Sequence, residues 1–301
     1  MANVRDFRTR IRSVKSTQQI TRAMYLVSAA KMRRAQERIV AIRPYGRKML
    51  EVLSSLAARA DAAGHPLLAR RPEERVIAVV ITADKGLCGA FNTNILNQAR
   101  AFLDGKSGKK VQVDVVGKKG REWFKRRKYD VRRKEVDIFR NLAPQNAIDL
   151  ALPLIEPFTE GTIDAVYLVY NEFKSVIQQR VIIEPLLPIP VSIFESLAAG
   201  ANPTAGGADQ AARTPPEDYI YEPSAEAIFN TLLRRHVGTQ IYRALLESAA
   251  AEQGARMTAM DNATRNARDM IDSLTLKMNN IRQAAITKEI LEVVSGAEAL
   301  K

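Results

Sequence analysis

One short segment of the chain has the residue types of a phosphate-binding loop. It reads VIAVVITADKGLCGAFNTNI (residues 76–95), in which an apolar run leads to a turn with Gly86 and Gly89 and then to a helical pattern. A P-loop has four residues between its glycines and then Gly-Lys-Ser/Thr, and the dinucleotide motif has one residue between its first two glycines. Here two residues separate the glycines. The segment therefore predicts a structural strand–turn–helix junction, with Asn92 or Thr93 capping the helix.

Other patterns that could carry chemistry are few. His65 and His236 are far apart, and neither has cysteine or histidine neighbours at metal-ligand spacing. No Gly-x-Ser-x-Gly nucleophile motif is present. The single cysteine, Cys88, excludes an internal disulfide, and its apolar neighbours favour a small buried thiol in a reducing compartment. We therefore predict no catalytic, cofactor-binding or metal-binding residue in this chain.

The positive charge of the chain is unevenly distributed. The net charge is +13, and residues 1–60 alone hold 14 Lys and Arg against three acids. A second basic patch covers residues 106–134. Such surfaces bind nucleic acid, anionic membranes or acidic proteins. No apolar run approaches the ~20 residues of a membrane helix, and the N-terminus lacks the apolar core of a secretory signal.

Both ends of the chain have the pattern of long helices. Apolar residues near the N-terminus follow the 3–4 spacing of a coiled-coil seam, which turns polar in its middle and then apolar again. The seam positions are Val4, Phe7, Ile11, Val14, Gln18, Thr21, Tyr25, Ser28, Met32, Ala35, Ile39 and Ile42. Pro44 and Gly46 predict a bend. Near the C-terminus the same spacing joins Ile271, Leu274, Met278, Ile281 and Ala285.

These two helices are too long to stand alone in water, so we expect them to pair as a coiled coil. The C-terminal helix is rich in small residues, which fits either a plain spacer or a closely packed shaft. Between the helices, strands and helices alternate, which predicts a mainly parallel, Rossmann-like sheet. Strands are expected at residues 76–82, 111–117, 165–173 and 180–187, and helices at 92–103, 118–127 and 147–159.

The predicted fold class is thus α/β, with a long antiparallel coiled coil of N- and C-terminal helices and a Rossmann-like base domain. The domains are expected at residues 1–60, 61–220 and 221–301. An Ala-, Gly- and Pro-rich stretch at 196–219 predicts a mobile loop.

Several motifs resemble those of one family, the γ subunits of rotary F-type ATP synthases of the bacterial kind. ITKEILEVVSGAEA (residues 286–299) is similar to the C-terminal signature of that family. The segments IRSVKSTQQITRAMYLVSAAKMRRAQ, DKGLCGAFN, YIYEPS and ESAAAEQGARMTAMDNATRNA are similar to it too. The resemblance covers essentially the whole chain.

The resemblance implies a non-catalytic central stalk that turns inside a ring of α and β subunits. The base domain would meet the ε subunit and the ring of c subunits, and rotation would couple proton flow to ATP synthesis or hydrolysis. No cofactor is implied. The location implied is peripheral, on the cytoplasmic face of a bacterial inner membrane.

The resemblance also assigns contact residues. Met24 matches a methionine facing the acidic lever of the β subunit, Arg256 and Gln283 match positions coupled to it, and Arg282 and Thr287 lie beside the upper contact with the catalytic ring.

The basic residues Lys31, Arg33 and Arg34 suit acidic loops on β, and Glu289 belongs to the C-terminal signature. Tyr25 departs from the family, which often has a carboxylate there, so the local contact at this position stays open.

Two alternatives to this reading remain at the level of sequence. A nucleic-acid-binding protein would explain the basic N-terminal helix, but base-stacking aromatic residues are scarce there. A basic coiled-coil scaffold would not explain the inserted α/β domain. We therefore expect protein partners, and no nucleic acid.

Overall fold

A computed structural model describes most of the chain, namely residues 4–57, 64–176, 178–192, 194, 221–222 and 224–299. The expected loop at 196–219 lies outside these residues. The chain divides into two compact units, Lys31–Ala255 on one hand and Met1–Ala30 with Arg256–Lys301 on the other. We call them the α/β unit and the two-helix unit, and describe each by itself.

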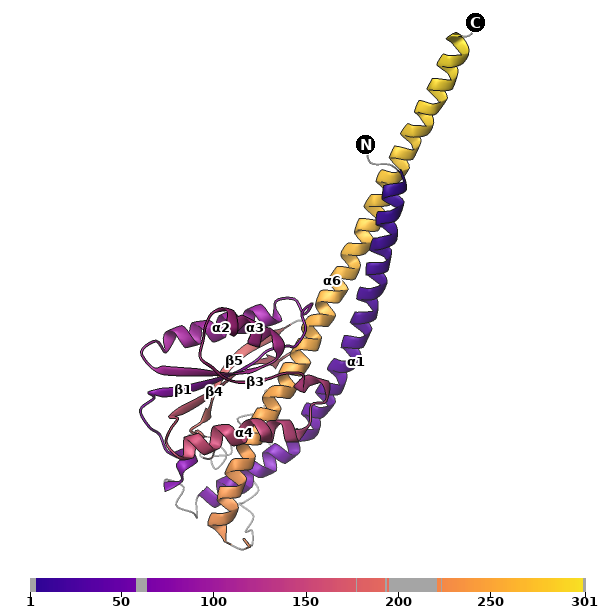
Figure 1. Cartoon of the computed structure of the whole chain (residues 1–301). Coiled ribbons are helices and arrows are strands. Elements are labelled where there is room, and N and C mark those ends of the chain that lie inside the picture. The colour runs from indigo at the N-terminus through magenta and orange to yellow at the C-terminus, as the bar shows by residue number, and fades with distance from the viewer. Residues whose placement is uncertain are drawn as a thin grey trace. The chain divides into compact units, whose positions relative to one another are not determined.

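A five-stranded sheet forms the centre of the described α/β unit (Figure 1). Its strands are β1 (Arg75–Ile81), β2 (Lys110–Val116), β3 (Val131–Glu135), β4 (Ala165–Phe173) and β5 (Gln179–Leu187). The order is β3-β2-β1-β4-β5, and every pairing is parallel except that of β4 with β5. The mainly parallel sheet is confirmed, and the four expected strands begin and end within one residue of their predicted bounds.

The sequence analysis missed β3. Its residues, VRRKE, are mostly charged, so they lack the apolar run that marks a buried strand. The strand lies at the edge of the sheet and is only half-buried, and charged side chains are tolerated on such edges.

Helices cover both faces of the sheet. One face packs on α2 (Phe91–Gly105) and α3 (Lys118–Arg126), and the other on α4 (Pro144–Thr159) with parts of α1 (Val4–Ala57) and α6 (Ala225–Ala299). Short 3-10 helices join the unit at η2 (Pro66–Leu68) and η3 (Ile138–Arg140). This three-layer arrangement is the one that alternating strands and helices predict.

The turn between β1 and α2 is tied to its surroundings by its own side chains. Asn92 accepts a hydrogen bond from the Ala83 amide at 3.0 Å and donates one to the Cys88 sulfur at 3.2 Å. Helix α2 begins at Phe91, and no side chain caps it. The capping role predicted for Asn92 or Thr93 is therefore wrong, because the Asn92 side chain reaches back to the strand end instead. The expected buried thiol is confirmed, since Cys88 is 2% exposed.

Helix α1 continues without interruption from Val4 to Ala57 and contains Pro44. The bend predicted at Pro44 and Gly46 therefore does not interrupt the helix. A proline removes one backbone donor from a helix, and the 54 residues of α1 accommodate that loss.

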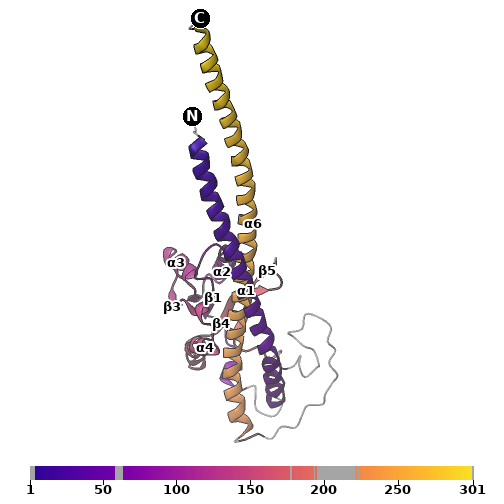
Figure 2. The same cartoon turned by 90° about the vertical axis from the view of Figure 1, so that its right-hand side faces the viewer.

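The two-helix unit consists of the N-terminal part of α1 and the C-terminal part of α6, which run antiparallel (Figures 1 and 2). The predicted seam is confirmed, since each seam position of α1 in this unit is less exposed than most of its neighbours. The hydroxyls of Thr21 and Thr264 lie 2.8 Å apart across the seam. Because the helices are antiparallel, Val4, 17 residues before Thr21, lies level with Ile281, 17 residues after Thr264.

Beyond Ile281, no described residue of α1 remains as a partner. Every residue from Arg282 to Gly296 is accordingly exposed, and Figure 1 shows α6 running on past the N-terminus of α1. The seam predicted at Ala285 is therefore wrong. Its spacing is right, but the partner helix has ended.

Candidate functional site

A side chain of the chain itself lies at the end of the sheet where many open α/β sheets bind ligands. Such ligands sit outside the carboxyl ends of the strands, often at a helix N-terminus. At that end of β1, the Asp84 carboxylate accepts hydrogen bonds from the Lys118 amide at 3.0 Å and the Asp137 amide at 3.2 Å. The first amide of α3 is therefore satisfied by a carboxylate of the chain itself.

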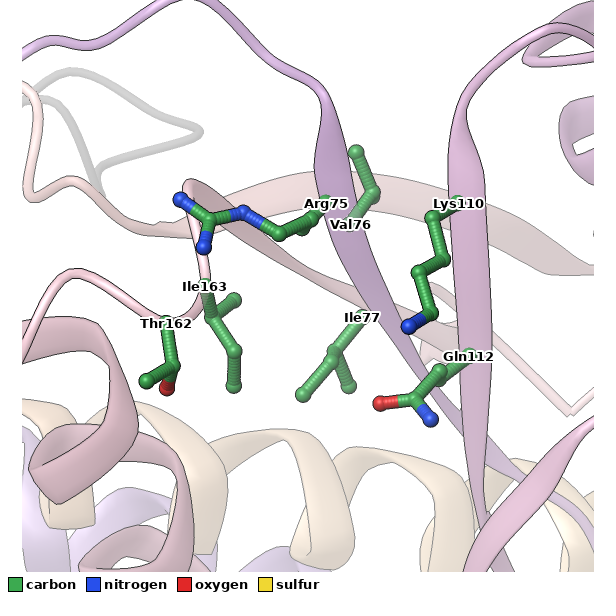
Figure 3. A pocket seen from close by; sticks show the side chains of 7 residues that line it. All are labelled: Arg75, Val76, Ile77, Lys110, Gln112, Thr162 and Ile163. Atoms are coloured by element: carbon green, nitrogen blue, oxygen red, sulfur yellow. The ribbon is translucent and has the colours of Figure 1, made fainter.

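A small hollow lies at the opposite end of the strands, lined by Arg75, Val76, Ile77, Lys110, Gln112, Thr162 and Ile163 (Figure 3). Figure 3 shows Lys110 and Gln112 projecting from one strand beside Ile77, with Arg75 on the other side. The Arg75 guanidinium already binds Asp164 at 2.7 Å and the Gly161 carbonyl at 2.7 Å. The charge of Arg75 is therefore used inside the fold.

Near that hollow, the carboxylate of Glu73 is also bound to groups of the chain itself. Glu73 bonds to Lys106, accepts from the Tyr167 hydroxyl at 2.5 Å and pairs with Lys109 at 2.9 Å. The Lys106 ammonium and then the Tyr167 hydroxyl lower the pKa of Glu73 to about 2. A carboxyl with so low a pKa is a poor proton donor near neutral pH. We therefore assign this cluster a structural role, in which Glu73 joins β4 to the segment between α2 and β2. Among the described residues, no group of three potential metal ligands is found.

The middle of α1 in the two-helix unit has an inverted pattern. Polar residues occupy the seam, where Thr21 is 8% and Ser28 2% exposed, whereas Ile20, Leu26 and Val27 are 58%, 56% and 54% exposed. Apolar side chains on an outer helix face indicate a contact with another molecule.

An open groove lies beside this inverted stretch. Arg265 pairs with Asp261 at 2.5 Å in the groove, and Arg22 and Arg268 leave it positively charged. It is lined by Gln18, Gln19, Arg22, Ala23, Leu26, Asp261, Thr264, Arg265 and Arg268. The groove thus combines apolar surface with positive charge.

The residues predicted for partner contact in the two-helix unit fall into two groups. Met24 is half-buried and Arg256 is 8% exposed, so both are largely enclosed within the chain. Arg282, Gln283, Thr287 and Glu289 are exposed.

The Thr287 hydroxyl donates to the Gln283 carbonyl at 2.9 Å, which places these two residues on one helix face, as predicted. The hydroxyl proton is therefore used within the helix, and the Thr287 oxygen can act toward a partner only as an acceptor.

The end of α6 around Thr287 is also apolar. Its exposed large side chains are Ile286, Ile290, Leu291, Val293 and Val294, which are 48–72% exposed. On an unpaired helix they form a surface that needs a partner.

In the α/β unit, Lys31, Arg33 and Arg34 are exposed, and Arg33 pairs with Glu37 at 3.2 Å within the same helix. The unit also has a run of four exposed basic residues, Lys125, Arg126, Arg127 and Lys128, at and after the end of α3. These side chains belong to the basic patch predicted at residues 106–134.

Comparison with known proteins identifies the family. The family model described as ATP synthase matches residues 3–300. The chain belongs to the ATP synthase family. It is 48% identical to the ATP synthase gamma chain of Anaeromyxobacter dehalogenans (strain 2CP-1 / ATCC BAA-258) and 46% identical to that of Chloroherpeton thalassium. Both alignments cover 100% of this chain, with 100% and 99% of the respective relative.

Solved structures of the ATP synthase family share the fold. A chain from the central stalk and c-ring of the Tetrahymena thermophila mitochondrial enzyme has a TM-score of 0.57 and 29% identity, covering 81% of this chain and 99% of that one. A Euglena gracilis chain has a TM-score of 0.67 over 99% of this chain and 94% of its own length, at 21% identity. The comparisons give no support to the scaffold or nucleic-acid alternatives. No helix in the described ranges is both long and apolar enough to cross a membrane.

The sequence analysis of this ATP synthase family member missed two candidate contact features. They are the groove and the exposed apolar residues of α1. A signal for both was available. Between residues 18 and 28 the 3–4 seam turns polar while apolar residues occur off the seam, at Ile20, Leu26 and Val27. An inversion of this kind marks the outer face of α1 as a candidate contact surface.

Proposed function

We propose that the chain is the central rotor stalk of an ATP synthase. Its two-helix unit turns inside a ring of α and β subunits, and its α/β unit meets the ε subunit and the c-ring. Proton flow in the membrane sector turns the stalk, and the orientation of the stalk biases the catalytic sites toward different conformations. The chain itself is non-catalytic, and ATP chemistry belongs to the α and β subunits.

One observation carries this proposal, the exposed apolar end of α6 from Arg282 to Gly296. A helix end of this kind is stable in water only with a surrounding partner. The named relatives are gamma chains of ATP synthases, which supports a ring of catalytic subunits as that partner.

We further propose three functional parts, residues 1–60, 61–220 and 221–301, and a peripheral location on the cytoplasmic face of a bacterial inner membrane. The two gamma chains reported above come from bacteria, which supports the location. The proposed contacts with the ring are Met24, Lys31, Arg33, Arg34, Arg256, Arg282, Gln283, Thr287 and Glu289. The inverted stretch and groove of the two-helix unit join them, and their positive charge suits acidic segments of β.

Co-expression with the α, β and ε subunits of the same bacterium tests the proposal. We expect a complex with one copy of this chain per three α and three β subunits, and ATP-driven rotation of a bead fixed to the chain. A different ratio, or a hexamer with the same multi-site ATP turnover when the chain is omitted, would contradict it.

A further inference from the structure

Strand β4 is longer than the strand beside it. It pairs with β1 only from Ala165 to Val169, so its last four residues have no β1 partner. Successive amides of a strand point to opposite sides, and an unpaired amide inside a protein is costly. The amides of Asn171 and Phe173 therefore need acceptors from another element.

Helix α6 supplies those acceptors. The Ser248 hydroxyl oxygen accepts from the Asn171 amide at 3.2 Å, and a Glu247 carboxylate oxygen accepts from the Phe173 amide at 3.0 Å. Side chains of the helix thus continue the pairing where β1 ends. Ser248 is 1% exposed, so its bond is shielded from water.

The same stretch of α6 is also bonded to the next strand. Arg243 donates to the Glu184 carboxylate of β5 at 2.6 Å. Glu184 lies opposite Leu168 of β4 in the antiparallel register. Arg243 and Glu247 are four residues apart and share one side of the helix, so the helix is held to both strands. We call Glu184, Arg243, Glu247 and Ser248, with the two β4 amides, the helix–sheet joint.

The joint differs in kind from the apolar core around it. Apolar contacts such as those of Leu245 with the sheet are non-directional, and they resist separation more than rotation. Hydrogen bonds and ion pairs depend on angle as well as distance. Three polar bonds to two strands therefore fix the angular position of α6 about its own axis relative to the sheet.

We propose that the helix–sheet joint transmits torque between the sheet and α6. Arg243, Glu247 and Ser248 are positioning residues, which keep the helix from turning against the sheet under load. This inference rests on the proposed rotor function.

Two variants of the joint and two matched controls separate this role from folding. Glu247→Leu combined with Ser248→Ala removes both acceptors of the β4 amides, whereas Glu247→Gln keeps an acceptor oxygen. Thr231→Ala removes an exposed hydroxyl that, within the described residues, bonds only to the Ala227 carbonyl of the same helix. Glu226→Leu makes the same carboxylate replacement at an exposed position of the first turn of α6.

The experiment measures the torsional stiffness of this chain in its assembled complex with the α, β and ε subunits. A bead is attached to the α/β unit through Lys125→Cys, which is exposed, while the native Cys88 is buried. We expect the angular variance of the bead during catalytic dwells to rise by about twofold in the double variant, since two of three directional bonds are lost. Glu247→Gln, Thr231→Ala and Glu226→Leu should match the parent complex, as should unloaded ATP hydrolysis in all variants.

Hydrogen exchange of the same complexes locates the effect. The Asn171 and Phe173 amides should exchange faster in the double variant, and only the Asn171 amide in Ser248→Ala. If the double variant does not assemble, Ser248→Ala replaces it in the test. The angular variance of the bead and the exchange rate of the Asn171 amide are then measured in that variant. Unchanged variance in a rotating variant would overturn the joint alone, while a parent complex that does not rotate would overturn the proposed function and this inference together.

Discussion

At the scale of single residues, His236 is a buried imidazole on α6. It is 2% exposed, and within the described chain its Nδ1 has no hydrogen-bond partner. Burial first, and the nearby charge of Arg243 second, lower the pKa of His236 to about 4 from an ordinary 6.5. The unfolded chain therefore binds more protons than the folded chain between these two values, and stability rises with pH across that window.

Replacing this imidazole should remove most of that dependence. We expect the parent chain to lose on the order of 2–3 kcal/mol of unfolding free energy as pH falls from about 6.5 to 4, and His236→Leu to lose much less. Urea unfolding at a series of pH values measures the difference. His65→Gln serves as the control and should keep the steep dependence. Parallel curves for the parent and His236→Leu would refute the assignment.

Gln283 and Thr287 form a neutral hydrogen-bonding face on the exposed end of α6. Contact with the catalytic ring during part of each turn would make each bond worth about 1 kcal/mol, or several-fold in rate. We expect Gln283→Leu or Thr287→Val to assemble normally and to lower multi-site ATP turnover, with a larger loss in the double variant. Ala285→Leu, which adds an apolar side chain on another side of the same helix, is the matched control. A double variant with full turnover would show that this face is merely solvated.

At the scale of the elements, the end of β2 depends on one glycine. A Cβ at Gly117, whose φ is +97°, would lie 2.2 Å from the Thr82 carbonyl oxygen. Gly46 lies inside α1 and would place its Cβ in open space. The two positions therefore respond to the same substitution in opposite ways.

We expect Gly117→Ala to lower the unfolding free energy by about 3 kcal/mol or more, because backbone must move and the new side chain sits at positive φ. Gly46→Ala should raise the unfolding free energy by about 0.5–1 kcal/mol, since alanine loses less entropy in a helix. Thermal and urea unfolding of both variants measure this. A Gly117→Ala variant as stable as the parent chain would mean that this close approach is absent in solution.

The elements also show which parts of the structure the sequence could predict. The apolar β1, β2 and β4 were predicted within one residue because their period and length are unambiguous. β3 was missed because an edge strand can be built from charged residues. Spacing predicted the seam as far as Ile281, but it could not show where the partner helix stops, since that depends on the register of two distant segments.

The candidate contact residues divide in the same way. The common face of Gln283 and Thr287 follows from helical spacing, and the structure confirms it. The burial of Arg256 and the enclosure of Met24 depend on packing, which no local pattern of residues contains. The helix–sheet joint was unpredictable for the same reason, because Glu247 and Phe173 are 74 residues apart.

At the scale of the whole molecule, a mainly parallel sheet between layers of helices gives the chain the outline of a nucleotide-binding fold. Neither glycine-rich phosphate motif is present in the sequence. The Asp84 carboxylate accepts a hydrogen bond from the amide at the start of α3. We expect calorimetry of the isolated chain with magnesium-ATP to show no stoichiometric site of micromolar strength. The assembled complex, whose partners carry the ATP chemistry in the proposed function, is the positive control. One-to-one binding by the isolated chain would contradict the expectation.

The exposed apolar end of α6 has a consequence for how the protein must be produced. Side chains such as Val293, which is 72% exposed, and Leu291, at 60%, are adhesive until another molecule covers them. Surplus copies of the chain would therefore be substrates for chaperones and proteases, or would aggregate. Because α6 extends beyond α1, the chain must be synthesised together with the partners that cover this end.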